Sequence, residues 1–529
     1  MKKSEINYVK SSPITQTTAQ KLKSECFLAI NYSKYHQEDA RWSIRSLASD
    51  LVAKSKINNN FGSIAPQLPN NNDLLMSQAL IENQSEDCLN LNIYSKHLSE
   101  DSISTSKNLC PVMVWIHGGG FIVGAGSLPI YEGSNLATAT NCIVVTLNYR
   151  LGALGFLRLK DITKGEINST GNEGLEDQIL ALHWLQKNIH HYGGDKNNIT
   201  LFGESAGAMS IACLLAIPKA KGLFHKAIMQ SGAGHTFNTV KQANEVTEEF
   251  LVSANTLGLV TSQLAPEQLA QQLKKLTTTQ VLTIQAHLVA RPEIYSKFGI
   301  LPFKPVVGDA DLPVAPYEAI KQGCAKNIPL LSGSNTDEWT LFSAMFNQNI
   351  TNEAVLNHWL TSLMGSEHVE STKTLMSKQC QQRNIAPTLQ NVLSETLTEF
   401  WFVQPSYRLL HAQLHAGGEA FSYKLGRKTV LPSMRCTHIT DLGLVFNNVS
   451  NTFHGEEPRV AELVKEIQTH WGDFAHFGTP SHEANRWPKL TEGLTEIMFF
   501  DHHETYVKSI PNKDTLFWSI ITDKQLASF

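Results

Sequence analysis

The chain has 529 residues, of which 42% are hydrophobic and 17% charged, and its formal net charge is −4. A chain of this composition can bury a large core, and without a basic excess it gives no support for nucleic-acid binding. No apolar run approaches the roughly 18 residues of a membrane span, and no apolar segment follows the N-terminal lysines, so we expect a cytoplasmic protein with neither a membrane-spanning helix nor a signal peptide.

Short apolar runs alternate with helical segments over most of the chain. The runs that predict strands are, in chain order, residues 89–94, 111–116, 142–150, 198–202, 226–232, 327–335 and 419–425. Residues 176–192 and 266–282 carry apolar side chains at helical spacing. This alternation predicts a mostly parallel sheet with helices on both faces, and ligands bound where the strands end. Without repeats or low-complexity linkers, we predict one domain over residues 1–529, with helical insertions above the sheet.

The segment NITLFGESAGAMS, residues 198–210, places a serine at a sharp corner between a predicted strand and a predicted helix. Gly203, Ser205 and Gly207 match the GxSxG nucleophile elbow, whose small residues let the strand and helix approach while the turn pushes the serine outward. The helix start adds backbone N–H groups and the positive end of the helix dipole. An ordinary glycine-rich turn is the alternative, but the strand-to-helix context favours a nucleophile.

A second glycine-rich segment, WIHGGGFIVGAG at residues 115–126, directly follows a predicted strand. Three consecutive glycines let backbone N–H groups turn towards a ligand without Cβ clashes, as in the HGGG loop of lipases and esterases. The N–H of Ala206 would complete such an oxyanion hole. A phosphate-binding loop is the alternative, but the lysine of the GxxxxGK[ST] pattern is missing.

With SEDCLNLNIY, VVTLNYRLGALGFL, GNEGLEDQILALHWLQKNI and FHKAIMQSGA, these segments make the chain similar to the type-B carboxylesterases, the family that includes the cholinesterases. The resemblance is almost unbroken over residues 85–233 and continues more weakly towards the C-terminus. It implies an α/β-hydrolase fold, with a central mostly parallel sheet, helices on both faces and helical insertions above the strand ends.

The family's catalytic triad has the order Ser, Glu, His. Carried over to this sequence, the resemblance implies Ser205 as nucleophile, Glu338 of SGSNTDEW as acid and His438 of HITDLGLVF as base. The remaining residues that it implies are the oxyanion donors Gly119, Gly120 and Ala206, and a supporting hydroxyl, Ser231.

The residues alone leave rivals for the acid and the base. His454 lies in a polar loop similar to that of His438, and family spacing favours His438. Asp337 is adjacent to Glu338, and only one of the two carboxylates can reach the imidazole. Asp441, three residues after His438, is interpreted as a local ion partner of that histidine.

Two further polar residues flank the predicted site. Glu204 precedes the serine and is interpreted as a hydrogen-bonding residue behind it, with a preference for cationic substrates as the alternative. His117 precedes the glycines and is interpreted as a brace of their loop rather than a proton carrier.

The resemblance implies two-step acyl transfer, in which His438 deprotonates Ser205, Glu338 orients the imidazole and backbone N–H groups bind the oxyanion. No metal or cofactor is needed, and activity should fall below about pH 6–7, where an unperturbed histidine is protonated. The predicted substrates are small neutral esters, and Gly299 and Leu301 suggest a pocket for medium acyl chains. Thioester or lactone hydrolysis and a catalytically inactive binding protein are the alternatives, and the oligomeric state stays open.

The loop before Cys88 departs from the family. Residues 65–88 contain no aromatic residue, whereas cholinesterases carry a tryptophan there that holds choline, so choline esters are not expected to be preferred. The loop also lacks the cysteine with which Cys88 would pair in secreted relatives. Because the eight cysteines form no CxxC motif and several lie in apolar runs, we expect reduced thiols throughout.

Overall fold

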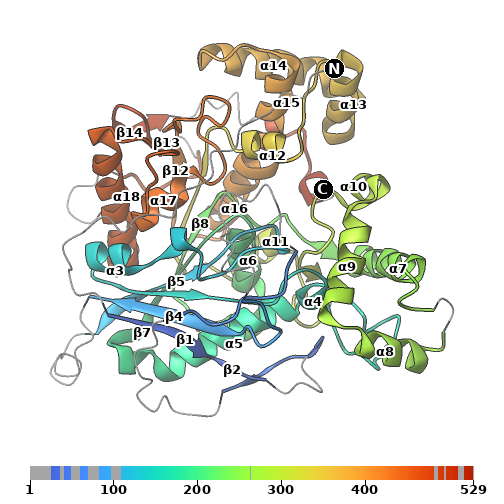
Figure 1. Ribbon diagram of the computed structural model, residues 1–529. Helices are drawn as coiled ribbons and strands as arrows, with labels where there is room; N and C mark the ends of the chain where they lie inside the picture. The colour runs from blue at the N-terminus through green and yellow to red at the C-terminus, as the bar shows by residue number, and fades with distance from the viewer. Residues whose placement is uncertain are drawn as a thin grey trace.

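A sheet of ten strands runs through the middle of the molecule (Figure 1). The computed structural model describes residues 25–35, 41–48, 60–68, 83–96, 109–261, 264–481, 487–493, 496–509 and 517–527. The strands of the sheet are β1 (Glu25–Asn31), β4 (Asn90–Ser95), β5 (Cys110–Ile116), β6 (Ile143–Leu147), β7 (Gly194–Glu204), β8 (Lys226–Gln230), β11 (Leu330–Asn335), β12 (Ala420–Leu425), β13 (Glu496–Phe500) and β14 (Thr505–Ser509). Shorter strands outside it are β2 (Ser33–Lys34), β3 (Ser46–Leu47), β9 (Asn238–Thr239) and β10 (Val306–Val307).

The sheet is parallel in its centre and antiparallel at its edges. Its strand order is β1-β4-β6-β5-β7-β8-β11-β12-β13-β14. All pairs from β6 to β13 are parallel, whereas β1–β4, β4–β6 and β13–β14 are antiparallel. The expected mostly parallel sheet is therefore present, and its parallel strands bring their carboxyl ends to one edge.

Helices cover both faces of this sheet. They are α3 (Ser134–Thr140), α4 (Gly152–Gly155), α5 (Glu173–Asn188), α6 (Ala206–Ala216), α7 (Val240–Thr256), α8 (Pro266–Lys275), α9 (Thr278–Val289), α10 (Pro292–Phe298), α11 (Pro316–Lys321), α12 (Trp339–Met345), α13 (Glu353–Met364), α14 (Val369–Gln382), α15 (Leu389–Thr398), α16 (Gln404–His415), α17 (Thr440–Phe446), α18 (Pro458–Phe477) and α20 (Asp523–Ala527). A π-helix, η5 (Glu399–Val403), joins α15 to α16, and the 3-10 turns are η1 (Pro129–Tyr131), η2 (Ile189–Tyr192), η3 (Pro218–Ala220) and η4 (Ser366–His368).

The two faces follow from the alternation of side chains along the strands. On β5, Val112, Val114 and Ile116 join the core that contains side chains of α5, α6 and α16. The intervening Met113 and Trp115 join the opposite core, with side chains of α3, α17 and α18. Strands that are buried on both faces read as continuous apolar runs, which is why the sequence predicts them well.

The helical insertions lie in two groups, α7–α10 at the right of Figure 1 and α12–α15 at its top. The second group has its own apolar core, which also takes up Trp518 and Ile521 from the C-terminal segment. The single helix predicted over residues 266–282 is wrong, because the chain divides into α8 and α9. The side chain of Thr277 accepts a hydrogen bond from the backbone N–H of Gln280, and this capping box starts a new helix.

The predictions for the loop before Cys88 and for its thiol can be compared with the structure only in part. The middle of the loop predicted to lack a choline seat, residues 69–82, lies outside them. Cys88, at the end of that loop, is a buried free thiol. Within the described ranges, none of the helices combines the length and the apolarity that crossing a membrane requires.

Candidate active site

Ser205 stands at the corner between β7, which ends at Glu204, and α6, which begins at Ala206. Its backbone has φ 53° and ψ −123°, a conformation that costs free energy in any residue with a Cβ. The Ser205 N–H donates to the Gln230 carbonyl over 2.9 Å, and the Ser205 carbonyl accepts from the Met209 N–H over 2.9 Å. The surrounding chain therefore fixes the serine in a strained strand-to-helix turn, the geometry expected of the predicted nucleophile elbow.

The glycines beside Ser205 are required by close approach. A Cβ on Gly207 would lie 1.9 Å from the carbonyl oxygen of Ile116, and one on Gly203 would lie 2.7 Å from the same atom. A Cβ on Gly232 would lie 2.5 Å from the Ser205 carbonyl oxygen. The elbow is thus pressed against the end of β5, where the glycine-rich loop begins.

That loop carries the predicted oxyanion donors. Gly119 and Gly120 have φ values of +108° and +60°, and both are half-buried. A Cβ on Gly118 would lie 3.1 Å from the Ser205 Cβ, so the loop lies directly against the elbow. Among the hydrogen bonds of the described residues, none is donated by the backbone N–H of Gly119, Gly120 or Ala206.

Glu338 and His438 come together from two different loops. The Nδ1 atom of His438 lies 2.6 Å from Oε2 of Glu338, and both side chains are buried. The other carboxylate oxygen of Glu338 accepts from Ser231 Oγ and from the Asn335 N–H, each over 2.6 Å. The Asn335 side-chain amide also donates to the carbonyls of Thr437 and His438 over 2.8 and 2.9 Å, which ties the two loops together.

The second ring nitrogen of His438 faces Glu204. Its Nε2 atom lies 3.0 Å from Glu204 Oε1, although the angles do not make a hydrogen bond. No hydrogen bond between Ser205 Oγ and His438 Nε2 is present among the described residues. The structure therefore brings the histidine together with two carboxylates, and places Ser205 next to one of them in the chain.

The two carboxylates change the titration of the site. Burial raises the pKa of Glu204 to about 8, although the nearby His438 opposes that rise. Burial alone would lower the pKa of His438, but the carboxylates of Glu204 and Glu338 outweigh it and raise this pKa to about 9. An imidazole between two buried carboxylates thus favours its protonated form.

Asp337 takes no part in this cluster. Its carboxylate lies 2.6 Å from the Arg383 guanidinium and 3.2 Å from that of Arg435. Adjacent residues thus face different partners, with Glu338 on the imidazole and Asp337 in a buried ion-pair network.

The rival histidine, His454, uses both ring nitrogens, one within its own loop and one on the start of α17. Its Nδ1 atom accepts from the Ser450 N–H over 3.1 Å, and its Nε2 atom lies 3.2 Å from the Thr440 carbonyl. Burial lowers its pKa to about 4, so the ring is neutral and no proton acceptor remains free.

Asp441 forms no direct ion pair with His438 among the described residues, although its charge helps to raise the pKa of that histidine. Its Oδ2 atom instead accepts from Gln230 Nε2 over 2.8 Å and from the Tyr423 hydroxyl over 3.2 Å. Asp441 is the second residue of α17, so its side chain projects from the helix start towards β8 and β12.

His117 braces the glycine-rich loop. Its Nδ1 atom lies 2.8 Å from the Gly118 carbonyl, and its ring stacks on Tyr149 at 4.4 Å between centroids. The Tyr149 hydroxyl in turn donates to the His117 carbonyl over 2.8 Å. Burial lowers the pKa of His117 to about 4, which keeps the ring neutral.

Two aromatic residues that the sequence did not single out enclose His438. Ring centroids of Phe342 and Phe402 lie 5.1 and 4.6 Å from that of the imidazole. Phe342 is four residues after Glu338, one helical turn away, so the spacing in α12 could have indicated it. Phe402 lies on the π-helix η5, for which the sequence has no local signal.

Leu301 borders the glycine-rich loop. A Cβ on Gly120 would lie 3.0 Å from Leu301 Cδ2. The residue that the resemblance places in the acyl pocket is therefore in contact with a predicted oxyanion donor.

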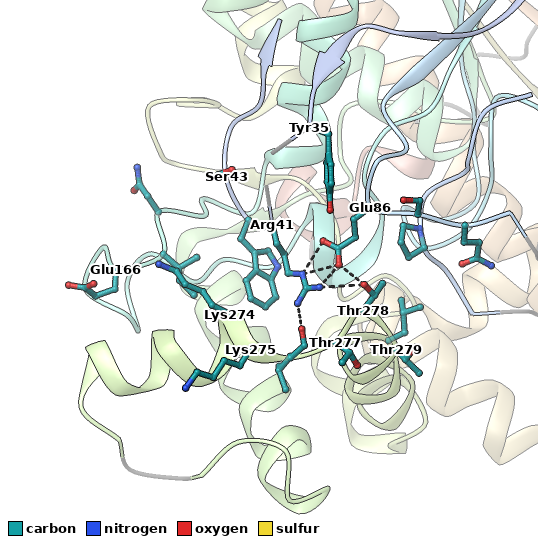
Figure 2. A pocket seen from close by; sticks show the side chains of 18 residues that line it. Tyr35, Arg41, Ser43, Glu86, Glu166, Lys274, Lys275, Thr277, Thr278 and Thr279 are labelled. Atoms are coloured by element: carbon teal, nitrogen blue, oxygen red, sulfur yellow. Dashed lines mark hydrogen bonds and ion pairs between the residues drawn. The ribbon is translucent and has the colours of Figure 1, made fainter. Parts of the chain in front are cut away.

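A separate cavity of about 800 Å³ lies between the N-terminal segments and helices α8 and α9 (Figure 2). Its lining is mostly polar, and Arg41 is paired there with Glu86 and lies near Thr278. None of the predicted catalytic or oxyanion residues lines it. In the part of the chain that the structure describes, no group of histidine, cysteine and acidic side chains is arranged to hold a metal ion.

Comparison with known proteins relates the chain to carboxylesterases, in agreement with the resemblance seen in the sequence. Residues 14–518 match the model of the carboxylesterase family. The chain is 36% identical over 453 residues to the para-nitrobenzyl esterase of Bacillus subtilis, covering 84% of this chain and 85% of that protein. It is 31% identical over 449 residues to the human cocaine esterase, covering 81% of this chain and 72% of that protein.

Solved structures agree with these sequence relatives. A structure of PNB esterase superposes with a TM-score of 0.75 at 32% identity, over 96% of this chain and 97% of that chain. A carboxylesterase of Geobacillus stearothermophilus gives a TM-score of 0.76 at 28% identity, over 94% of this chain and 96% of that chain.

Proposed function

Because the chain belongs to the carboxylesterase family, and is thus a serine carboxylic-ester hydrolase with the α/β-hydrolase fold, we propose that Ser205, His438 and Glu338 are its catalytic triad. Its substrates are small neutral esters with short-to-medium acyl chains. The observation that carries this proposal is the contact of 2.6 Å between His438 Nδ1 and Glu338 Oε2 beside the strained elbow that holds Ser205.

The reaction begins when the Ser205 hydroxyl attacks the ester carbonyl. Its proton passes to Nε2 of His438, and the resulting imidazolium is stabilised by Glu338 at Nδ1. The oxyanion accepts hydrogen bonds from the backbone N–H groups of Gly119, Gly120 and Ala206, which have no protein acceptor among the described residues. The imidazolium then protonates the leaving alcohol.

An acyl-enzyme on Ser205 remains, and water repeats the same steps to release the carboxylic acid. Glu204 lies beside Nε2, so its carboxylate adds to the stabilisation of the imidazolium in both steps. Above about pH 8, where Glu204 is ionised, its charge offsets part of the cost of holding a positive ring among the buried side chains of Glu204, Glu338 and His438.

The proposal predicts covalent labelling at one serine and a defined chain-length preference. An organophosphate should react with Ser205 and abolish turnover of p-nitrophenyl esters, and the adduct is located by peptide mass spectrometry. Because Gly299 and Leu301 are smaller than a phenylalanine in the predicted acyl pocket would be, rates across acetate to decanoate should peak at medium chains. An adduct on another residue contradicts the nucleophile, and a sharp acetate optimum contradicts the acyl pocket.

The pH dependence should be more alkaline than an unperturbed histidine would give. His438 must be neutral to accept the serine proton, and its pKa is raised to about 9, so kcat/KM should rise with pH up to that region. Glu204→Gln removes one carboxylate, lowers the pKa of His438 and should move the acidic limb down by roughly 1–3 pH units. The measurement is kcat/KM from pH 5 to pH 10, at about unit intervals.

Glu462→Gln is the matched control, because this carboxylate is exposed on α18. It should leave the profile in place. A limb that stays fixed in Glu204→Gln, or that moves to higher pH, contradicts the role given to Glu204.

A further inference from the structure

The side chain of Gln67 pairs with the backbone of Gly124. Its Oε1 atom accepts from the Gly124 N–H over 2.8 Å, and its Nε2 atom donates to the Gly124 carbonyl over 3.0 Å. The same Nε2 atom donates to the Ala65 carbonyl over 3.0 Å, so the amide is fully engaged. Gln67 is 2% exposed, and its segment is 57 residues away from the loop in sequence.

Gly124 closes the glycine-rich loop on itself. It has φ +112°, and a Cβ there would lie 2.5 Å from the Gly118 carbonyl oxygen. The N–H groups of Ile122 and Val123 donate to the Gly119 carbonyl over 3.1 and 3.0 Å. The position of Gly124 thus fixes the start of the loop, and with it the direction of the N–H groups of Gly119 and Gly120.

Gln67 is itself held in place by its neighbours. Its N–H donates to Gln84 Oε1 over 2.7 Å, and the Ile64 N–H donates to the Asn83 carbonyl over 2.9 Å. At the other end of the loop, the Gly126 N–H donates to Asn148 Oδ1 over 2.8 Å. The loop is therefore held at Gly124 and Gly126 by two side-chain amides, and Gln67 is the one that binds both the N–H and the carbonyl of a single residue.

We infer that Gln67 is a positioning residue for the oxyanion hole, acting through Gly124 on the N–H groups of Gly119 and Gly120. This inference rests on the proposed function, which gives those N–H groups their role. Oxyanion donors help only when they lie within a few tenths of an ångström of the position that the charged oxygen takes. Without Gln67, the buried N–H and carbonyl of Gly124 lose their partners, and the loop must shift to find others.

The test is Gln67→Met, which keeps the volume of the side chain and removes its hydrogen bonds. We expect kcat for a p-nitrophenyl ester to fall about 10- to 100-fold, less than the loss of one whole donor, while KM stays within about twofold. Inhibition by a trifluoromethyl ketone, which forms a tetrahedral adduct with an oxyanion, should weaken by the same factor as kcat/KM. If this variant does not fold, Gln67→Glu is the second test. Its carboxylate keeps an acceptor for the Gly124 N–H but cannot donate to the Gly124 carbonyl, so kcat and the ketone inhibition should again weaken together.

Ser63→Ala is the control from the same segment, because the hydrogen bond of its hydroxyl among the described residues goes to the exposed Asn83 side chain. It should leave kcat and the ketone inhibition unchanged. An unchanged kcat in Gln67→Met, a higher KM at constant kcat, or a loss equal to the fraction of unfolded protein overturns the inference. Full turnover in Ser205→Ala would instead overturn the proposed function. The two failures are therefore distinguishable.

Discussion

Ser205→Ala should lower kcat for an activated ester by roughly 10⁴- to 10⁶-fold, the largest loss expected from any single change in this chain. In the proposed mechanism the hydroxyl forms the acyl-enzyme, and neither His438 nor Glu338 can replace it as a nucleophile in the same geometry. The residual rate should come from the oxyanion donors and from binding alone. Steady-state rates with p-nitrophenyl esters, measured at saturating substrate, give the comparison.

Two further variants separate chemistry from folding in this experiment. Ser210→Ala changes a buried serine on α6, the helix that follows Ser205. Its hydroxyl accepts a hydrogen bond from Gln178 Nε2 over 3.2 Å, and the variant should keep nearly full activity. Ser205→Gly removes the Cβ from a residue with φ 53°, so it should be as inactive as Ser205→Ala but more resistant to thermal unfolding. Activity within about tenfold of wild type in Ser205→Ala would exclude this residue as the nucleophile.

The elbow and the glycine-rich loop can be found from the sequence because each is local. The turn at Ser205 needs Gly203 and Gly207 within two residues, and the structure shows why, since both lie against the Ile116 carbonyl. Strands such as β5 and β6 can also be predicted from the sequence, because a strand that is buried on both faces consists of an unbroken run of apolar residues. Every such feature depends on residues that are close in the chain.

The partners of Ser205 are not local, and composition or periodicity could not have selected them. His438 and Glu338 are 100 residues apart, so only the family resemblance pointed to them. Asp337 and Glu338 look alike in sequence, and what separates them is the pair of arginines that holds Asp337, one of them on a loop beyond β12.

Other contacts could not be predicted from the sequence, because they also join residues from different elements of the fold. The contact between Glu204 and His438 joins β7 to the loop before α17, and it raises the pKa of His438 above the unperturbed value on which the expected pH dependence was based. Asp441 was paired with His438 because it is three residues away, but the start of α17 turns its side chain towards Gln230. Gln67 has no motif around it, and only the folded chain shows that it holds the glycine-rich loop.

Glu338 and Asp337 offer a test in which neighbouring carboxylates should fail in different ways. Glu338→Gln keeps the size of the side chain but removes the charge that stabilises the imidazolium, and kcat should fall by roughly 10³- to 10⁴-fold. The loss should be smaller than for Ser205→Ala, because Glu204 still lies 3.0 Å from Nε2.

Asp337→Asn should instead destabilise the fold while chemistry continues. It leaves Arg383 and Arg435 without their shared carboxylate, and breaking a buried ion pair costs about 3–5 kcal/mol, less here because Arg383 also contacts Glu395. We expect a lower midpoint of urea unfolding and a kcat within about tenfold of wild type for the folded fraction. Because Glu338 is bound by Ser231 and Asn335 rather than by Asp337, its orientation should survive the change. Equal losses of kcat in the two variants would mean that the acid has been assigned to the wrong carboxylate, or that the whole loop after β11 moves as one unit.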